Sequence, residues 1–121
     1  MLDTNALMMA VEAEVRLFEE LARLGATDYL TPRAVVGELE SLAAGVGEEA
    51  SAASVGLDLI ERCTVRGTDA GYADDAVLEL ATATDADFAV TNDEGLRDRL
   101  LAASVPVIGL RGGAKLAITQ P

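Results

Sequence analysis

Short apolar segments alternate with helical patterns along the chain, and this alternation limits the folds that the chain can adopt. The predicted strands end at Asp3 and cover 28–31, 64–67, 87–92 and 105–110, and residues 112–120 return as a hairpin arm or an edge strand. The predicted helices cover 6–24, 33–44, 57–63, 72–81 and 93–104, whereas 45–56 indicate either a loop or a loose helix start. Helical crossovers of this kind join parallel strands. We therefore expect a three-layer α/β/α fold, with a central parallel sheet of about five short strands and helices on both faces.

The chain is long enough for one domain with its own core. We expect its 121 residues to form a single domain over 1–121, in which the first strand is either very short or truncated. Ala, Val and Leu must build the core, because the chain has no Trp, two Phe and two Tyr. No apolar run reaches the about 18 residues of a membrane span. The lone Cys63 cannot form an internal disulfide, so a cytoplasmic protein without a membrane anchor is the simplest expectation.

The charge balance of the chain is strongly acidic. Asp and Glu number 21 against nine Lys and Arg, and the net charge is −12. Such a surface repels nucleic acid at low salt. Two explanations stay open: the protein avoids polyanions, or it is halophilic and works where the Debye length shrinks to about 3 Å at 1 M salt. A single lysine, Lys115, and abundant Ala, Val and Thr favour the halophilic explanation.

A carboxylate occupies the apolar face of the predicted helix 72–81. Helical spacing puts Asp74 on one stripe with Val77, Leu78 and Ala81. An unpaired carboxylate that faces the core is costly, so it needs a cation, and the nearest base in the sequence is Arg66. Clustered carboxylates without His or Cys favour a hard ion such as Mg²⁺ or Mn²⁺. Asp75 points about 100° away from Asp74, at the rim, where it suits a helix start.

Asp3 and Asp93 each follow a predicted strand directly. Both therefore belong at the carboxyl edge of the sheet, where α/β proteins bind ligands. Each also has a purely structural explanation. Asp3 is a good helix N-cap, and Asp93 complements the dipole of a helix that Thr91 and Glu94 begin as a capping box.

Missing residue types exclude several other chemistries. Without His, the chain cannot form a Ser–His or Cys–His nucleophile. One Cys and no His cannot make a structural zinc site. The lone glycine pair in "LRGGAK" predicts a hairpin turn and not a phosphate-binding loop.

Four motifs in order resemble the PIN-domain nucleases: "LDTN", "GELESL", "YADDAVLELA" and "VTND". Their order, spacing and α/β setting agree over nearly the whole chain. The resemblance is closest to the branch of small-subunit rRNA-processing factors of archaea and eukaryotes, in which "GYADD", "TNDEGL" and "VPVIGLRGGAKLAI" have similar counterparts. The VapC-type toxins are more distant, since they usually carry one Asp where this chain has Asp74 and Asp75.

The resemblance implies a site and a reaction. It implies that Mg²⁺ or Mn²⁺ binds at four catalytic carboxylates, with three supporting polar groups; the carboxylates are Asp3, Glu38, Asp74 and Asp93, and the supporting residues are Asp75, Asn5 and Thr91. Periodicity alone does not separate Glu38 from Glu40. The implied activity is metal-dependent endoribonuclease cleavage of RNA phosphodiesters, which leaves a 5′-phosphate and a 3′-hydroxyl.

The resemblance also implies partners. They are RNA, above all rRNA precursor, and ribosome-assembly proteins, with a second copy of the chain in a homodimer as a further candidate. Two alternative functions stay open, a VapC-type toxin ribonuclease and a PIN-fold scaffold that binds RNA or assembly factors without cutting. The basic residues that family members use to hold RNA are largely missing here.

The acidic composition predicts a salt response. If the surface is halophilic, the melting temperature should rise from about 0.1 M to above 1 M KCl, because salt screens self-repulsion. Thermal unfolding across that range measures it. A melting temperature that stays flat or falls would contradict the halophilic explanation.

Overall fold

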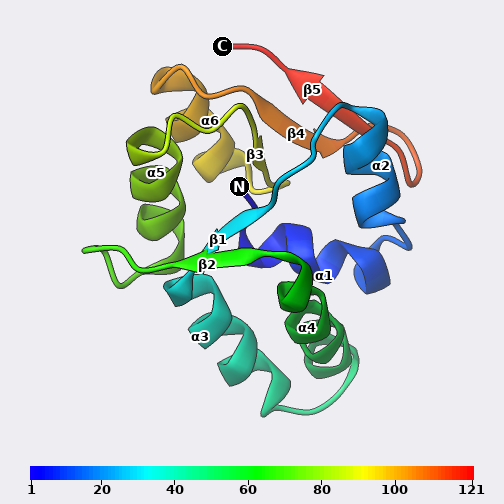
Figure 1. Cartoon of the computed structure of the whole chain (residues 1–121). Coiled ribbons are helices and arrows are strands. Elements are labelled where there is room, and N and C mark those ends of the chain that lie inside the picture. Colours follow the sequence, from blue (N-terminus) through cyan, green and yellow to red (C-terminus); the bar gives the residue numbers. More distant parts are fainter.

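Helices and strands alternate along the chain much as the sequence predicts (Figure 1). The computed structural model describes all residues, 1–121. The α-helices are α1 (Thr4–Glu12), α2 (Leu17–Arg23), α3 (Arg33–Ala43), α4 (Glu48–Leu59), α5 (Ala73–Ala83) and α6 (Glu94–Ala102), and a 3₁₀ turn covers Ile60–Arg62. The strands are β1 (Leu30–Pro32), β2 (Thr64–Arg66), β3 (Ala89–Val90), β4 (Val107–Leu110) and β5 (Leu116–Thr119).

The first three residues join the strands into one layer. Strand β1 pairs with β2 in parallel, and β3 pairs with β4 in parallel. Between these pairs, Leu2 forms a parallel bridge with Val90, and its N–H donates to the Leu30 carbonyl at 2.8 Å. The order across the layer is therefore β2, β1, residues 1–3, β3, β4 and β5. Residues 1–3 thus lie at the centre of the sheet.

The layer is parallel except for its last strand. β5 returns antiparallel to β4 as the predicted hairpin arm, and Gly112 and Gly113 both have positive φ in the turn between them. Helix α2 holds this arm, because the Glu20 carboxylate accepts from the Leu116 N–H at 3.0 Å and Arg23 donates to the Leu116 carbonyl at 2.7 Å. None of the helices is long and apolar enough to cross a membrane.

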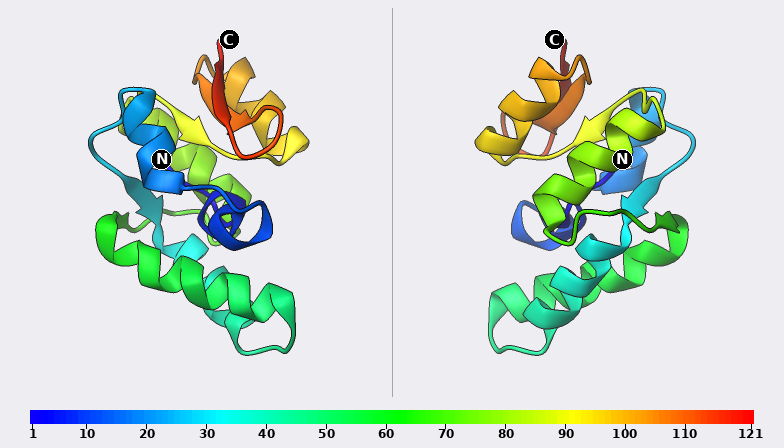
Figure 2. Two further views of the ribbon diagram at one scale, coloured as in Figure 1. Left: turned by 90° about the vertical axis from the view of Figure 1, so that its right-hand side faces the viewer. Right: turned by 90° about the vertical axis from the view of Figure 1, so that its left-hand side faces the viewer.

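The helices surround the strands on both sides. Figure 1 shows α5 and α6 to the left of the strands and α1 and α2 to the right, and Figures 1 and 2 show α3 and α4 as a pair at the end away from β5. Gly56 of α4 is needed for close packing there, since a Cβ would lie 3.1 Å from a Leu39 methyl and 3.3 Å from the Leu7 carbonyl. The α/β/α fold is confirmed.

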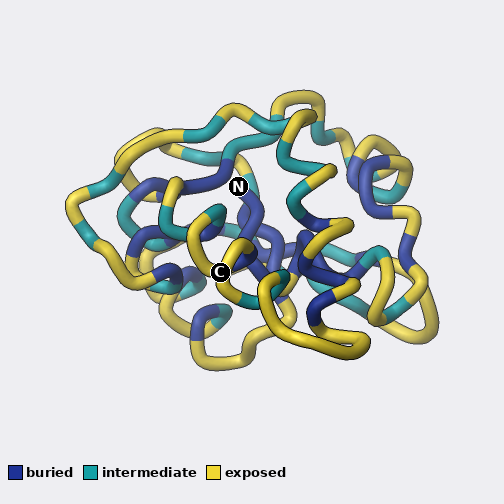
Figure 3. The backbone as a smooth tube through the Cα atoms, turned by 90° about the horizontal axis from the view of Figure 1, so that it is seen from below, coloured by how far each residue is buried: buried dark blue, intermediate teal, exposed yellow.

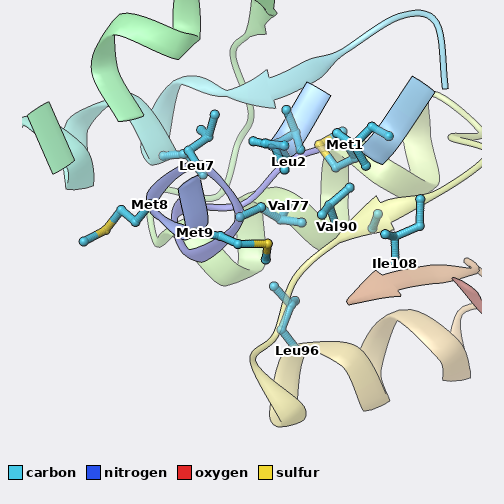
Figure 4. Close-up of a cluster of buried hydrophobic side chains, with 14 of the residues drawn as sticks. Met1, Leu2, Leu7, Met8, Met9, Val77, Val90, Leu96 and Ile108 are labelled. Carbon is cyan, nitrogen blue, oxygen red and sulfur yellow. The ribbon is translucent and has the colours of Figure 1, made fainter. Parts of the chain in front are cut away.

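The core lies between these layers and includes the amino-terminal residues. Figure 4 shows side chains from α1, α5, β3, α6 and β4 in one cluster around Leu2. Figure 3 shows the tube dark blue, and thus buried, at the N-terminus. Small residues make up much of this core, as the scarcity of aromatic residues predicts.

One predicted helix is wrong, and at a second segment the structure decides between the two stated alternatives. The predicted helix 6–24 is two helices, because residues between α1 and α2 leave the helical conformation and Glu14 adopts a φ of 52°. The break buries Val15 and leaves Val11 at 39% exposure, whereas one straight helix would have buried both. Helix α4 already begins at Glu48, inside the segment 45–56 that was expected to be a loop or a loose helix start.

A side chain replaces a missing backbone donor in the centre of the sheet. In a parallel ladder the Leu2 carbonyl would next receive the N–H of residue 32, but Pro32 has none. The hydroxyl of Thr31, which is fully buried, donates to that carbonyl instead at 2.9 Å. This bond holds the residue before Asp3 against β1.

Replacing this hydroxyl should therefore destabilise the fold. Thr31→Val keeps the side-chain shape but leaves the buried Leu2 carbonyl without its donor, so the free energy of unfolding should fall by about 1–3 kcal/mol. Urea unfolding measures the change. Thr64→Val is the matched control, because Thr64 is exposed on β2 and its hydroxyl forms no hydrogen bond. Equal stabilities for the two variants would refute the role of the Thr31 hydroxyl.

Candidate active site

Asp3 lies at the carboxyl end of the central segment, between β1 and β3. Its side chain is only 4% exposed, and its Oδ1 accepts from the Ala6 N–H at 2.7 Å, so it is the N-cap of α1. The Thr91 side chain lies close enough to this carboxylate to lower its pKa. The capping role is confirmed, but N-caps are usually solvated. The capping role alone does not explain why the Asp3 carboxylate is so deeply buried.

Asp93 begins α6 just beyond β3. Its Oδ1 accepts from the Leu96 N–H at 2.8 Å, and its own N–H donates to the Thr91 hydroxyl at 3.0 Å. The predicted capping box of Thr91 and Glu94 is thus wrong, because the helix begins two residues later than that pattern requires and Asp93 is the cap. The second oxygen, Oδ2, accepts no hydrogen bond from the protein. Thr91, one of the predicted supporting residues, thus lowers the pKa of Asp3 and accepts from the Asp93 N–H.

The adjacent pair on α5 points in the two directions that periodicity predicts. Asp74 is half-buried on the side of the buried Val77, whereas Asp75 is exposed. Asp75 accepts from the Arg99 guanidinium of α6 at 2.8 Å. The cation nearest to this pair is therefore Arg99 and not Arg66, a partner that sequence spacing does not reveal.

The loop before α5 is fixed by an acid of the same helix. The Glu79 carboxylate accepts from the N–H groups of Asp69 and Ala70, at 2.8 and 3.0 Å. This clamp holds residues 67–72 against α5. It sets where the first turn of α5, with Asp74, meets the sheet edge.

The three aspartates act on one another electrostatically. Burial raises the pKa of Asp3 to about 7, the Thr91 side chain and the Ala6 N–H lower it, and the charges of Asp74 and Asp93 raise it further. Burial also raises the pKa of Asp74, as do Asp93 and Asp75, while Arg99 lowers it. Asp3, Asp74 and Asp93 therefore form a mutually repulsive group at the carboxyl edge of the sheet, and Asp3 has no cationic partner.

Two asparagine side chains link the backbone segments that surround the three aspartates. The Asn5 side chain accepts from the Asn92 N–H at 2.9 Å, and the Asn92 side chain accepts from the Leu110 N–H at 2.7 Å. They connect α1, the end of β3 and the end of β4. Sequence reasoning named Asn5 and missed Asn92. The signal for Asn92 was its place between Thr91 and Asp93, directly after a strand.

Glu38 is placed differently from the aspartates. It is exposed on α3, where the neighbouring Val35 and Leu39 face the core. It is not among the groups that shift the pKa of Asp3 or Asp74. Its role as a metal ligand stays a prediction.

The oxygen atoms of the candidate residues meet the chemical needs of a divalent ion. All candidate ligands are oxygens, and a buried carboxylate without a cation is the group that Mg²⁺ or Mn²⁺ would stabilise. No three acidic side chains converge closely enough to form a finished cage. The site fits the ion in chemistry and charge, and binding requires the carboxylates to rotate toward a common point.

Comparisons with known proteins identify the family and the fold. A family model described as a PIN like domain matches residues 1–113. A solved structure described as "Structure of the PIN domain endonuclease Utp24" is similar, with a TM-score of 0.79 and 26% sequence identity over 99% of this chain and 90% of that chain. A search of the curated proteins found no match.

Asp3 should make stability depend on pH when no metal is bound. Its pKa is about 7 in the folded chain and about 3.8 when unfolded, so the folded state keeps a proton that the unfolded state loses between these values. The free energy of unfolding should thus be higher at about pH 5 than at about pH 8 in EDTA, by up to about 2.6 kcal/mol. Urea unfolding at both pH values measures it.

Asp3→Asn is the control for this prediction, because Asn keeps the α1 cap and cannot titrate. Its pH profile should be flatter than that of the unaltered chain, and it should be the more stable of the two at about pH 8. Parallel profiles would show that the Asp3 carboxyl titrates normally.

Proposed function

The chain belongs to the PIN-like domain family, and from this membership we propose that it is a metal-dependent endoribonuclease whose site is the group of Asp3, Asp74 and Asp93. The observation that supports the proposal most is the burial of the Asp3 carboxylate between two strands, with two further carboxylates acting on it and no cation beside it. The PIN domain nuclease fold sets the class of the protein. Cleavage of RNA and dependence on metal are the proposed steps beyond that class.

Mg²⁺ or Mn²⁺ would be held by Asp3, Asp74 and Asp93, with Glu38 as a further ligand from α3. When bound, such an ion supplies charge neutralisation, activation of water for attack on phosphorus and stabilisation of the leaving oxygen. One oxygen of Asp3 and one of Asp93 accept from the helix amides that these residues cap, at 2.7 and 2.8 Å, and the carboxylates would still rotate toward the ion. Asp75 is engaged by Arg99, so its part is to support Asp74.

The substrate and partners of the proposal rest on the motifs. We infer that rRNA precursor is the RNA that is cut, with ribosome-assembly proteins as partners, because "GYADD" and "TNDEGL" resemble the rRNA-processing branch of the family. A similar solved protein is described as an endonuclease, which supports internal cleavage. A cytoplasmic site of action and a halophilic surface belong to the same proposal and rest on composition.

A second candidate function is a scaffold that binds RNA without cutting it. Two observations favour it: no three acidic side chains converge to hold an ion, and Glu38 is exposed on α3. A scaffold would not need the carboxylates to converge. Metal-dependent cleavage separates this candidate from the first.

Substitutions at the adjacent aspartates of α5 test the proposal. Asp74→Asn keeps the side-chain shape and removes a charge that acts on Asp3, so the rate of RNA cleavage with Mn²⁺ should fall at least about 100-fold. Asp75→Asn should cost less, because Asp75 faces Arg99. Cleavage of total RNA at molar KCl, with and without Mn²⁺, measures both.

Asp58→Asn is the matched control, since Asp58 is exposed on α4 and has no ion pair. It should leave the rate unchanged. A dead Asp75→Asn with an active Asp74→Asn would reverse the roles of the pair. An unaltered chain that binds RNA but never cuts it would favour the scaffold.

A further inference from the structure

A hollow lies at the amino ends of β1 and β3, at the edge of the sheet opposite the aspartates. Its volume is about 290 Å³. One wall is the segment 25–30, which leads into β1, and the other is the segment 84–88, which leads into β3. Its floor is apolar and includes Met1, Leu2 and Ile108, which Figure 4 shows in one cluster. The hollow is therefore separate from the proposed active site.

The β3 wall of the hollow carries a backbone donor without a partner. In the parallel ladder between the central segment and β3, the Val90 N–H donates to the Met1 carbonyl at 2.8 Å, and the Met1 amino group donates to the Phe88 carbonyl at 3.2 Å. The Phe88 N–H would donate the next bond of such a ladder. It forms no hydrogen bond within the chain, although the Phe88 side chain is half-buried.

The β1 wall carries the matching open acceptor. On this side the Leu2 N–H donates to the Leu30 carbonyl at 2.8 Å. The next acceptor of a parallel ladder lies two residues earlier, at the Asp28 carbonyl, and it too forms no hydrogen bond within the chain. An extended segment in the hollow can therefore bond to both walls and continue the sheet, as peptides do when they add a strand to a sheet.

The rim of the hollow is acidic. Asp28 lies on the β1 wall, and Asp85 and Asp87 lie on the β3 wall; all three are exposed and none forms an ion pair. No Lys or Arg lines the hollow, and its only basic group is the amino group of Met1. These charges repel RNA, and they also repel a second copy of a chain whose net charge is −12. They favour a cationic partner.

We propose that this hollow binds an extended segment of a basic partner protein, which adds to the sheet between β1 and β3. Successive side chains of a strand point to opposite faces. A segment in which apolar residues alternate with Lys or Arg would thus place its apolar side chains on the floor and its charges near the acidic rim. This inference goes beyond the proposed nuclease function and does not depend on it.

Peptide binding tests the proposal. The probe is a fluorescein-labelled peptide of about seven residues, a common strand length, in which Val alternates with Lys and both ends are blocked. Fluorescence anisotropy is recorded with the whole 121-residue chain, with any affinity tag at the carboxyl terminus, across a KCl series that begins at about 0.1 M. The peptide should bind saturably. A peptide with Glu in place of Lys should not bind, and one that is N-methylated throughout should bind far more weakly, because it has no N–H to donate.

Substitution of the rim locates the binding on the protein. The triple variant Asp28→Asn, Asp85→Asn and Asp87→Asn should weaken binding about tenfold at the lowest salt, because it removes three exposed charges that the peptide approaches. A matched control removes three exposed and unpaired acids from α3 and α4, by Glu40→Gln, Glu49→Gln and Asp58→Asn. It should change the affinity little. Equal losses in the two triple variants would show general attraction to an acidic surface and overturn the proposal.

Hydrogen exchange at one amide tests the added strand itself. The Phe88 N–H should exchange at least about tenfold more slowly when the peptide is bound, because it gains a backbone acceptor. An unchanged exchange rate at saturation would overturn the proposal even if the peptide binds. Slower exchange that appears with rising protein concentration alone would assign the hollow to a second copy of the chain, and it would also overturn the proposal.

Discussion

The burial of the Asp3 carboxylate is the constraint on which the rest of the site depends. Residues 1–3 are the central strand, held to β1 by the Leu2 N–H and the Thr31 hydroxyl and to β3 by the parallel bridge to Val90. These bonds fix the backbone at Asp3, and its carboxylate lies buried at the edge of the sheet. It must stay in the sheet edge as a cap of α1, at a pKa of about 7, or gain a cation. In the proposed function, a bound cation would relieve the repulsion that the Asp3 carboxylate adds to the metal-free fold.

Helix N-termini offset part of the repulsion that this arrangement creates. Asp3 caps α1, Asp93 caps α6, and Asp74 lies in the first turn of α5, so each carboxylate is at the positive end of a helix dipole. The parallel topology brings these three helix starts to one edge. The same topology places Arg33, Arg66 and Arg111 along this edge, at the carboxyl ends of β1, β2 and β4.

The sequence allowed much of the fold and part of the site to be predicted. Alternation of strands and helices predicted the layers, and helical spacing predicted that Asp74 and Asp75 point in different directions. Both predictions depend only on residue patterns within single helices and strands. The break in the first helix at Glu14 carries no Gly or Pro signal, and it forms because Val15 is buried by tertiary packing. Arg99 was missed for a similar reason, since a partner on another helix leaves no mark in local spacing. Glu38 came from resemblance to a family alone, and the structure leaves it exposed.

The central claim is that the buried Asp3, with Asp74 and Asp93, forms a divalent-metal site whose ligands must lose a proton. Calorimetric titration of the protein with Mn²⁺ near neutral pH, in two buffers of different ionisation enthalpy, tests it most directly. Metal binding to a carboxyl that is partly protonated releases protons, so the apparent heat should differ between the buffers. Asp3→Asn should abolish that difference and weaken binding. A chain that binds no Mn²⁺, or binds it equally well in Asp3→Asn and with the same heat in both buffers, would contradict the account.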